Sequence, residues 1–303
     1  MKRENEGMHL GVVFPQTEIG TDPVLIRDFA QAAESLGYHH LLVYDHVLGA
    51  NTATRPSWRG PYTLKHTFHE PFVLFGHLAA STRRIELVIG VLILPQRQTA
   101  LVAKQAAAVD VLSGGRLRMG IGVGWNEVEY EALGADFRTR GARIEEQITV
   151  LRALWTQESV TFHGRWHRIS DAGINPLPVQ RPIPLWMGGE ADMVLHRAAR
   201  VADGWMSSRG FQALPDRPAG SSREEQVGRL RAHLAAGRRD AASLGIEGRI
   251  AFRQSGPDEW RRDIERWRKL GATHLSVDTM RSGLSTPHAH IDAIRRFHEA
   301  VAT

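Results

Sequence analysis

The hydrophobic pattern alternates short apolar runs with amphipathic stretches along almost the whole chain. The segment Ile85–Glu127 shows this most clearly. Residues Ile85–Pro95 are too continuously apolar for a strand with one wet face, which predicts a strand buried on both faces in a parallel sheet. The Ala-rich run Ala100–Leu112 predicts a helix that ends before Gly114, and Leu117–Trp125 predict a second buried strand. The segment therefore predicts a βαβ unit.

The same alternation predicts further strands on both sides of this unit. They are expected at Leu10–Pro15, Leu41–Tyr44, Pro184–Gly189, Gly204–Ser208, Ile250–Arg253 and Leu275–Asp278, with helices between them. One long polar helix is expected at Glu224–Leu244, and a small hairpin within Glu158–Arg181. The motif L-G-x-x-H-L-x-V occurs twice, in Leu36–Val43 and Leu270–Val277, each time where a predicted helix joins a strand.

Eight strand–helix pairs without an evident linker predict a single (β/α)8 TIM-barrel domain over residues 1–303, with insertions at its carboxyl-terminal face. A doubly wound open sheet is the alternative, but no G-x-G-x-x-G opens a helix after the first strand. Residues 1–7 are expected to be a disordered extension, since they are charged and lack a signal-peptide pattern. The segment Pro215–Ser222 is a candidate mobile lid.

Composition narrows the function classes. The chain has no cysteine, which excludes disulfides, thiolate catalysis and cysteine-ligated metals. No apolar run approaches the roughly 20 residues of a membrane span, so a cytoplasmic protein without a membrane partner is expected. The net charge of +5 suits an anionic small ligand, but the arginines are scattered, and no nucleic-acid partner is expected. His66 and His69 with Glu70 lack a complementary cluster, so no metal site is expected.

A few polar and glycine residues at predicted strand ends could carry chemistry. Asp45-His46 ends the second strand, where a barrel places catalytic groups, although a capping Asp and a packed His are the more common reading of such a pair. Gly122 and Gly124 could expose bare backbone to a planar ligand or serve close packing. Three further candidates for phosphate binding, each with a plain turn as the alternative, are Gly188-Gly189, Glu190 and Ser207.

Taken together, the ordered motifs resemble the luciferase-like monooxygenase superfamily, and within it the deazaflavin (coenzyme F420)-dependent oxidoreductases. The segments that carry the resemblance are Gly11–Pro15, Tyr44–Val47, Gly90–Pro95, Asp110–Arg116, Gly120–Trp125, Arg143 with Glu146, Phe162–Gly164, Pro184–Gly189 and Ala202–Trp205. They span the chain from Leu10 to about Ser208. Beyond that point the match thins, so the substrate is not identified by analogy.

The resemblance implies an isoalloxazine-type ring at the carboxyl-terminal mouth of the barrel. A non-prolyl cis peptide is implied at Gly90-Val91, against one face of the ring. The residues Gly122, Val123 and Gly124 would run beside the ring and its side chain. The residues Gly188, Gly189, Glu190 and Ser207 would bind the phosphate end. His46 would transfer a proton near the reactive carbon, with Asp45 as a possible orienting group.

The function expected from this resemblance is hydride transfer between coenzyme F420 and a small organic substrate, with His46 as proton donor or acceptor. A reduced-FMN-dependent monooxygenase of the luciferase or alkanesulfonate type is the alternative, and a non-catalytic flavin-binding barrel is a third. Motif details, the basic charge and the arginine- and alanine-rich composition favour F420 over FMN. Relatives form homodimers, and one is expected here. The aromatic residues Trp260, Trp267 and Phe297 could line its interface or fill the core.

Overall fold

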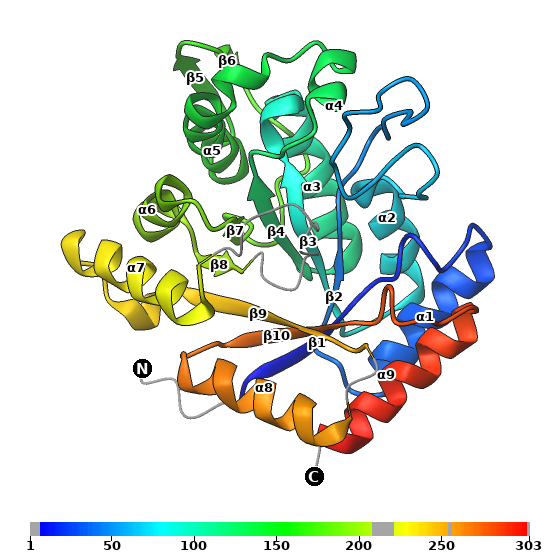
Figure 1. Ribbon diagram of the computed structural model, residues 1–303. Coiled ribbons are helices and arrows are strands. Elements are labelled where there is room, and N and C mark those ends of the chain that lie inside the picture. The colour runs from blue at the N-terminus through cyan, green and yellow to red at the C-terminus, as the bar shows by residue number, and fades with distance from the viewer. Residues whose placement is uncertain (1–6, 208–220, 254–255, 302–303) are drawn as a thin grey trace. The chain divides into compact units, whose positions relative to one another are not determined.

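A computed structural model describes residues 7–207, 221–253 and 256–301 of the chain (Figure 1). The parallel strands are β1 (His9–Val13), β2 (His40–Val43), β3 (Glu86–Ile93), β4 (Leu117–Gly122), β7 (Leu185–Gly188), β8 (Gly204–Met206), β9 (Gly245–Ala251) and β10 (His274–Asp278). They close into one barrel in the order β1-β10-β9-β8-β7-β4-β3-β2. The predicted (β/α)8 barrel is confirmed, and the open sheet is wrong.

The helices alternate with these strands. They are α1 (Pro23–Ser35), α2 (Pro71–Ser81), α3 (Thr99–Ser113), α4 (Glu127–Ala132), α5 (Arg140–Thr156), α6 (Asp192–Val201), α7 (Arg223–Ala236), α8 (Pro257–Lys269) and α9 (Pro287–Val301), with 3-10 turns η1 (Leu94–Gln96), η2 (Phe137–Thr139) and η3 (Ala241–Ser243). The strands β5 (Val160–His163) and β6 (Arg168–Ala172) form the predicted antiparallel hairpin outside the barrel.

The described residues divide into two compact units. The first takes in the chain up to Val43, Arg84–Glu86 and the chain from Trp186 onward, and the second takes in Tyr44–Arg83 and Leu87–Leu185. The second unit contains the candidate catalytic residues.

In the second unit, local signals set the ends of the elements. The Glu70 carboxylate accepts the amide of Val73 at 2.9 Å and caps α2, and Pro71 fits the first helical position, where no amide bond is lost. Helix α3 ends at Gly114, whose φ of 72° is in the left-handed region. Helix α3 packs against α2 and α5, and several of its buried residues are alanines, which allow a close approach. Strand β3 carries a bulge between Ile89 and Leu92, and the peptide Gly90-Val91 is cis, as predicted.

In the first unit, the repeated motif marks two equivalent joints. Gly37 and Gly271 both have positive φ, 89° and 74°, and both end a helix just before a strand. The histidines that follow them in the motif, His40 and His274, lie with their rings 5.7 Å apart on β2 and β10. Helix α9 packs between α1 and α8 (Figure 1). Trp260, Trp267 and Phe297 are buried inside this unit, so they are not available to an interface between subunits.

Two predicted boundaries are wrong in the first unit. The helix expected to reach Leu244 ends at Ala236, since Arg238 that follows has a φ of 53° and cannot continue it. Strand β9 begins at Gly245 rather than at Ile250. Its buried residues include Glu247 and Arg249. Because these side chains are charged, the hydrophobic pattern does not predict a strand there.

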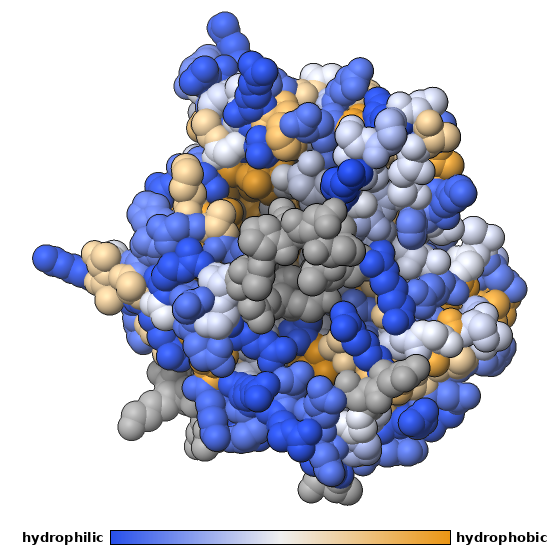
Figure 2. All heavy atoms as spheres, viewed as in Figure 1, coloured by the Kyte–Doolittle hydropathy of each residue, from blue (hydrophilic) through white to orange (hydrophobic). Residues whose placement is uncertain are grey.

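Two further expectations concern segments that the structure describes only in part. The extension predicted at residues 1–7 lies outside the described residues except for Gly7. The candidate lid, Pro215–Ser222, lies outside them except for its last two residues, 221 and 222. Ser222 at its end caps α7 in a capping box with Glu225. Among the described residues, no helix combines the length and apolarity that a membrane span needs. Polar residues predominate on the face drawn in Figure 2, and apolar ones occur there singly or in small groups.

Candidate active site

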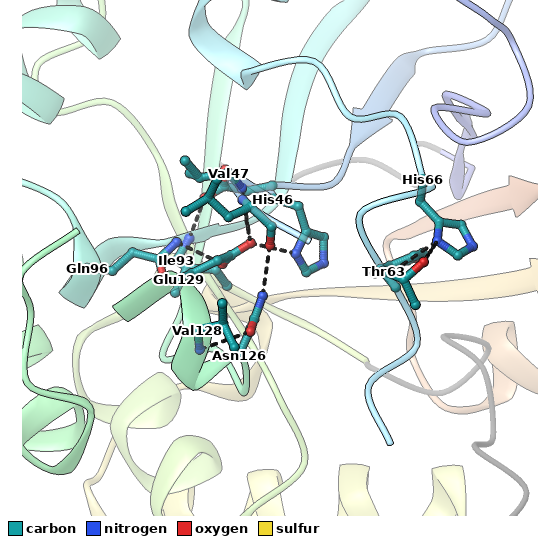
Figure 3. A network of polar contacts seen from close by, with 12 residues as sticks. His46, Val47, Thr63, His66, Ile93, Gln96, Asn126, Val128 and Glu129 are labelled. Carbon is teal, nitrogen blue, oxygen red and sulfur yellow. Dashed lines mark hydrogen bonds and ion pairs between the residues drawn. The ribbon is translucent and has the colours of Figure 1, made fainter. Parts of the chain in front are cut away.

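The candidate proton-transfer group, His46, follows β2 and is held by a carboxylate from another part of the second unit. Its Nδ1 lies 2.9 Å from Oε1 of Glu129, on α4 (Figure 3). The His46 side chain is 10% exposed, and that of Glu129 is 1% exposed. Nε2 of His46 makes no hydrogen bond to any residue that the structure describes. The imidazole is thus held in place through Nδ1, while Nε2 is available to a substrate.

The Glu129 carboxylate is ionised by its surroundings. Burial alone would raise its pKa, but the hydrogen bond and charge of His46, the amide of Gln96 and the backbone amide of Val47 together lower it. Oε1 accepts the amides of Val47 at 3.0 Å and Leu48 at 3.3 Å, and Oε2 accepts Nε2 of Gln96 at 3.1 Å. An ionised carboxylate only accepts hydrogen bonds, so the proton between the two side chains belongs to Nδ1 of His46.

This arrangement corrects the role expected for Asp45. Its carboxylate accepts the backbone amide of Ile93 at 2.9 Å and Nη2 of Arg97 at 2.7 Å. Nη1 of Arg97 lies 2.9 Å from Oε1 of Glu70. Burial would lower the pKa of Arg97, but these two carboxylates raise it above its usual value. Asp45 therefore joins β2 to the end of β3, and Glu129 takes the place beside His46 that was expected for Asp45.

Sequence reasoning missed both Glu129 and Gln96. Glu129 lies on a helix of six residues within a segment expected to be a loop, and Gln96 lies in the 3-10 turn η1. The Oε1 atom of Gln96 is buried and has no hydrogen-bond partner among the described residues. The only available signal for Glu129 was a charged residue just after a glycine-rich strand end, and many exposed glutamates share that setting.

The histidines near Glu70 do not form a metal site in the described part of the chain. Nδ1 of His66 lies within hydrogen-bond distance of the amide and the hydroxyl of Thr63. The Glu70 carboxylate caps α2 and pairs with Arg97. Among the described residues, no group of three or more His, Asp or Glu side chains is arranged to hold a metal ion.

Some of the residues expected beside a cofactor ring lie in the second unit, at the end of β3 and after β4. From Leu87 to Ile93 every residue of β3 is buried except Val91, which is half-buried. The bulge pairs Ile89 with Met119 and Leu92 with Ile121, so Gly90 and Val91 together face one residue of β4. Beyond β4, Val123, Gly124 and Trp125 are also half-buried.

Gly124 has a packing reason of its own. Its φ is +67°, and a Cβ added there would lie 2.6 Å from Cγ2 of Ile93. The carbonyl oxygen of its neighbour, Val123, accepts the hydroxyl of Tyr130 at 2.7 Å. Close packing therefore explains this glycine without a ligand, as the alternative reading of the motif allows.

The expected phosphate-binding residues lie in the first unit, and the structure links two of them through Gln226. Nε2 of Gln226 donates to the Glu190 carboxylate at 2.8 Å, and its Oε1 accepts the hydroxyl of Ser207 at 3.3 Å. Gly188 ends β7, and Gly189, directly after it, has a φ of 134°. The sequence reading missed Arg229 of α7, which donates to the backbone oxygen of Glu190 at 3.1 Å and brings a cation to this group.

Known proteins resemble this chain in sequence and in fold. Residues 8–268 match the luciferase-like monooxygenase family. An uncharacterised protein of Mycobacterium tuberculosis is 38% identical over 203 residues, 65% of this chain and 69% of that protein. An F420-dependent glucose-6-phosphate dehydrogenase of Intrasporangium calvum is 31% identical over 68% of this chain and 62% of its own length. An FMNH2-dependent dimethylsulfone monooxygenase of Pseudomonas putida is 34% identical over 47% of this chain and 40% of its own length.

Two solved structures show the same fold at low sequence identity. The monooxygenase RslO1 of Streptomyces bottropensis has a TM-score of 0.77 at 19% identity and covers 97% of this chain and 99% of its own. An F420-dependent secondary alcohol dehydrogenase has a TM-score of 0.74 at 16% identity. The match covers 98% of this chain and 99% of that protein's chain. The fold and the sequence match agree with the motifs, and the chain is an enzyme that belongs to the luciferase-like monooxygenase family.

Proposed function

We propose that the protein is an oxidoreductase that transfers a hydride between coenzyme F420 and a small organic substrate, with His46 as the proton donor or acceptor. The observation that carries the proposal is the state of the His46 imidazole. Nδ1 keeps its proton against the Glu129 carboxylate at 2.9 Å, and Nε2 has no recorded partner among the described residues. The proton that accompanies a hydride would then move at Nε2.

The chain's own residues divide the remaining work. We propose that the bulge at Gly90-Val91 and the strand end Gly122-Val123-Gly124 support the ring, and that Gly188, Gly189, Glu190 and Ser207 bind the phosphate end. The carboxylate of Glu190 accepts a hydrogen bond from Gln226, so Glu190 would contact the phosphate through its backbone. Arg229 would supply positive charge nearby. When bound, the deazaflavin supplies the two-electron chemistry at its C5 atom.

Two findings support F420 over FMN. The F420-dependent relative matches 68% of this chain, whereas the FMNH2-dependent relative matches 47%. The net charge of +5 also suits the longer, polyanionic tail of F420. A reduced-FMN-dependent monooxygenase is the second candidate, because the Pseudomonas putida relative is 34% identical where it matches.

The role of His46 is tested by its replacement. His46→Gln and His46→Ala should each lower turnover by roughly 10²–10⁴-fold, while F420 binding changes little, because the imidazole moves a proton rather than holding the cofactor. The measurement is steady-state kinetics together with fluorescence titration of F420. Unchanged turnover would remove His46 from this role. We also propose that the working form is a homodimer, which light scattering on the purified protein would test.

A further inference from the structure

The His46 imidazole is bordered by aromatic rings of the same unit. The rings of Tyr62 and Phe68 each lie 4.7 Å from it, and the ring of Trp125 lies 5.5 Å away. Trp58 extends this surface, with its ring 5.7 Å from that of Trp125. We call these four side chains, Trp58, Tyr62, Phe68 and Trp125, the aromatic wall.

The loop that carries most of the wall is held in place by hydrogen bonds. Nε1 of Trp58 donates to the carbonyl oxygen of Tyr62 at 3.0 Å. The amide of Leu64 donates to the carbonyl oxygen of Ala50 at 3.0 Å, and Figure 3 shows the same loop tied at Thr63 and His66. A Cβ on Gly60 would collide with Trp125 and Trp58, so the loop lies directly on these indoles. The rings are therefore fixed before a substrate arrives.

The charges behind His46 disfavour an anion at this place. The network holds three carboxylates, Glu129, Asp45 and Glu70, against the Arg97 guanidinium and the protonated His46, which gives a net charge of −1 when all are ionised. The guanidinium forms ion pairs with Asp45 at 2.7 Å and with Glu70 at 2.9 Å. A phosphate or carboxylate next to Nε2 of His46 would be repelled by this net negative charge.

Aliphatic side chains extend the apolar surface along the chain. Val47 and Leu48, directly after His46, are 41% and 42% exposed, and Leu64 of the wall's loop is 54% exposed. Contact with an apolar ligand would cover these three side chains.

From these rings and charges we infer that the substrate group reacting beside His46 is uncharged, apolar and planar, such as an aldehyde or ketone conjugated to a ring or to a C=C bond. The inference rests on the proposed function. In the reduction of such a group, the carbonyl carbon gains a hydride and the oxygen takes the proton from Nε2 of His46. The product is the alcohol, the cofactor is left oxidised by two electrons, and His46 regains its proton from solvent.

A matched pair of probes tests the inference without turnover. Benzaldehyde and 4-carboxybenzaldehyde share the carbonyl group and differ by one negative charge. Each is titrated into protein with ¹⁵N-labelled histidine, and the His46 signal is assigned by its loss in His46→Gln. Benzaldehyde should shift that signal and bind at least about tenfold more tightly than 4-carboxybenzaldehyde, because a like charge at close range is repelled. Equal or tighter binding of the acid, or no shift with benzaldehyde, would overturn the inference.

Two variants locate the binding surface. Phe68→Ala should weaken benzaldehyde binding by roughly two- to tenfold, the loss expected for one aromatic contact. Trp166→Ala, which removes an indole from the turn between β5 and β6, should leave the binding unchanged. Equal weakening in both variants, with the other histidine signals in place, would contradict the assignment to the aromatic wall.

The same samples separate this inference from the proposed function. If F420 does not bind, the proposed function fails, while the preference for benzaldehyde still stands or falls by the titration. If F420 binds and its reduced form reduces 4-carboxybenzaldehyde faster than benzaldehyde, the substrate class is wrong and the proposed function is retained.

Discussion

Nδ1 of His46 and Oε1 of Glu129 lie 2.9 Å apart, although 83 residues separate them in the sequence. The helix that carries Glu129 is only six residues long, so the glutamate depends on its own contacts for its position. The side chain of Asn126, which caps that helix, donates to the carbonyl oxygen of Leu48 at 3.0 Å and joins the two segments a second time. The imidazole and its carboxylate are thus held together by side chain and backbone.

Replacing Glu129 should impair the imidazole without removing it. Glu129→Gln removes the negative charge but keeps an oxygen beside Nδ1, because that atom also accepts the amides of Val47 and Leu48. The protonated imidazole that donates from Nε2 then loses its counter-charge. Turnover should fall by at least about tenfold, and by no more than the roughly 10²–10⁴-fold expected for loss of the imidazole itself. Nitrogen NMR of His46 in wild type and variant, recorded over a range of pH, checks whether the protonated imidazole is less favoured in the variant.

Glu129→Asp is the matched control, because it keeps the charge and shortens the side chain. It should retain the Nδ1–H tautomer and recover part of the activity. A Glu129→Gln protein with wild-type turnover and an unchanged His46 spectrum would refute the positioning role.

Removal of Arg97 should destabilise the fold. Arg97→Met leaves the fully buried Asp45 carboxylate with the Ile93 amide as its remaining donor among the residues that the structure describes. Breaking a buried pair from one side costs about 3–5 kcal/mol, since a charge is left uncompensated. Urea unfolding measures the loss. The double variant Arg97→Met with Asp45→Asn should recover part of it, and a double variant as unstable as the sum of the two single variants would argue against this ion pair.

A methyl group on Gly11 should also destabilise the protein. In the first unit the His40 imidazole lies over the backbone of Gly11, and an added Cβ would collide with it. His40 cannot move away freely, because its Nε2 is 2.8 Å from the Ser276 hydroxyl and 3.1 Å from Glu247. Gly11→Ala should cost about 1–3 kcal/mol by overpacking.

Gly76→Ala is the control for this substitution. Gly76 lies within α2 with no atom close to the added Cβ, so alanine there should be neutral or stabilising by about 1 kcal/mol. Thermal unfolding of both variants tests the comparison. Equal midpoints for the two variants would contradict the account of Gly11.

The β5–β6 hairpin should loosen in acid. The Glu146 carboxylate accepts the amides of Arg165, Trp166 and His167 and pairs with Nδ1 of His167 at 2.7 Å. Burial opposes ionisation, but these hydrogen bonds lower the pKa of Glu146 below its usual 4.5. A group with a lowered pKa in the folded state stabilises it fully above the unfolded pKa, and this stabilisation is lost as the pH falls through the lower, folded pKa.

The measurement compares wild type with Glu146→Gln by urea unfolding at about pH 5 and about pH 3, below the ordinary titration of histidine. The advantage of wild type should shrink at the lower pH. An advantage that stayed constant or grew would show that the carboxylate does not carry this stabilisation.

The sequence predicted the barrel because its strands are apolar and its helices carry their own boundary signals. The structure confirms the helix end predicted at Gly114. Asp22 and Glu70 mark helix starts in the same local way, because each accepts a backbone amide of the first turn. Strand β9 was misplaced because Glu247 and Arg249 are buried among polar partners, which no periodicity can reveal. Glu129 was missed for a related reason: its position depends on a contact across 83 residues, and its own segment was expected to be a loop.

The most direct test of the central claim is to titrate the apo protein with coenzyme F420 and, separately, with FMN, and to compare the dissociation constants by fluorescence and absorbance. The account predicts saturable binding of F420 that is tighter than that of FMN and weakened by Arg229→Met. Tight binding of FMN with none of F420 would contradict it.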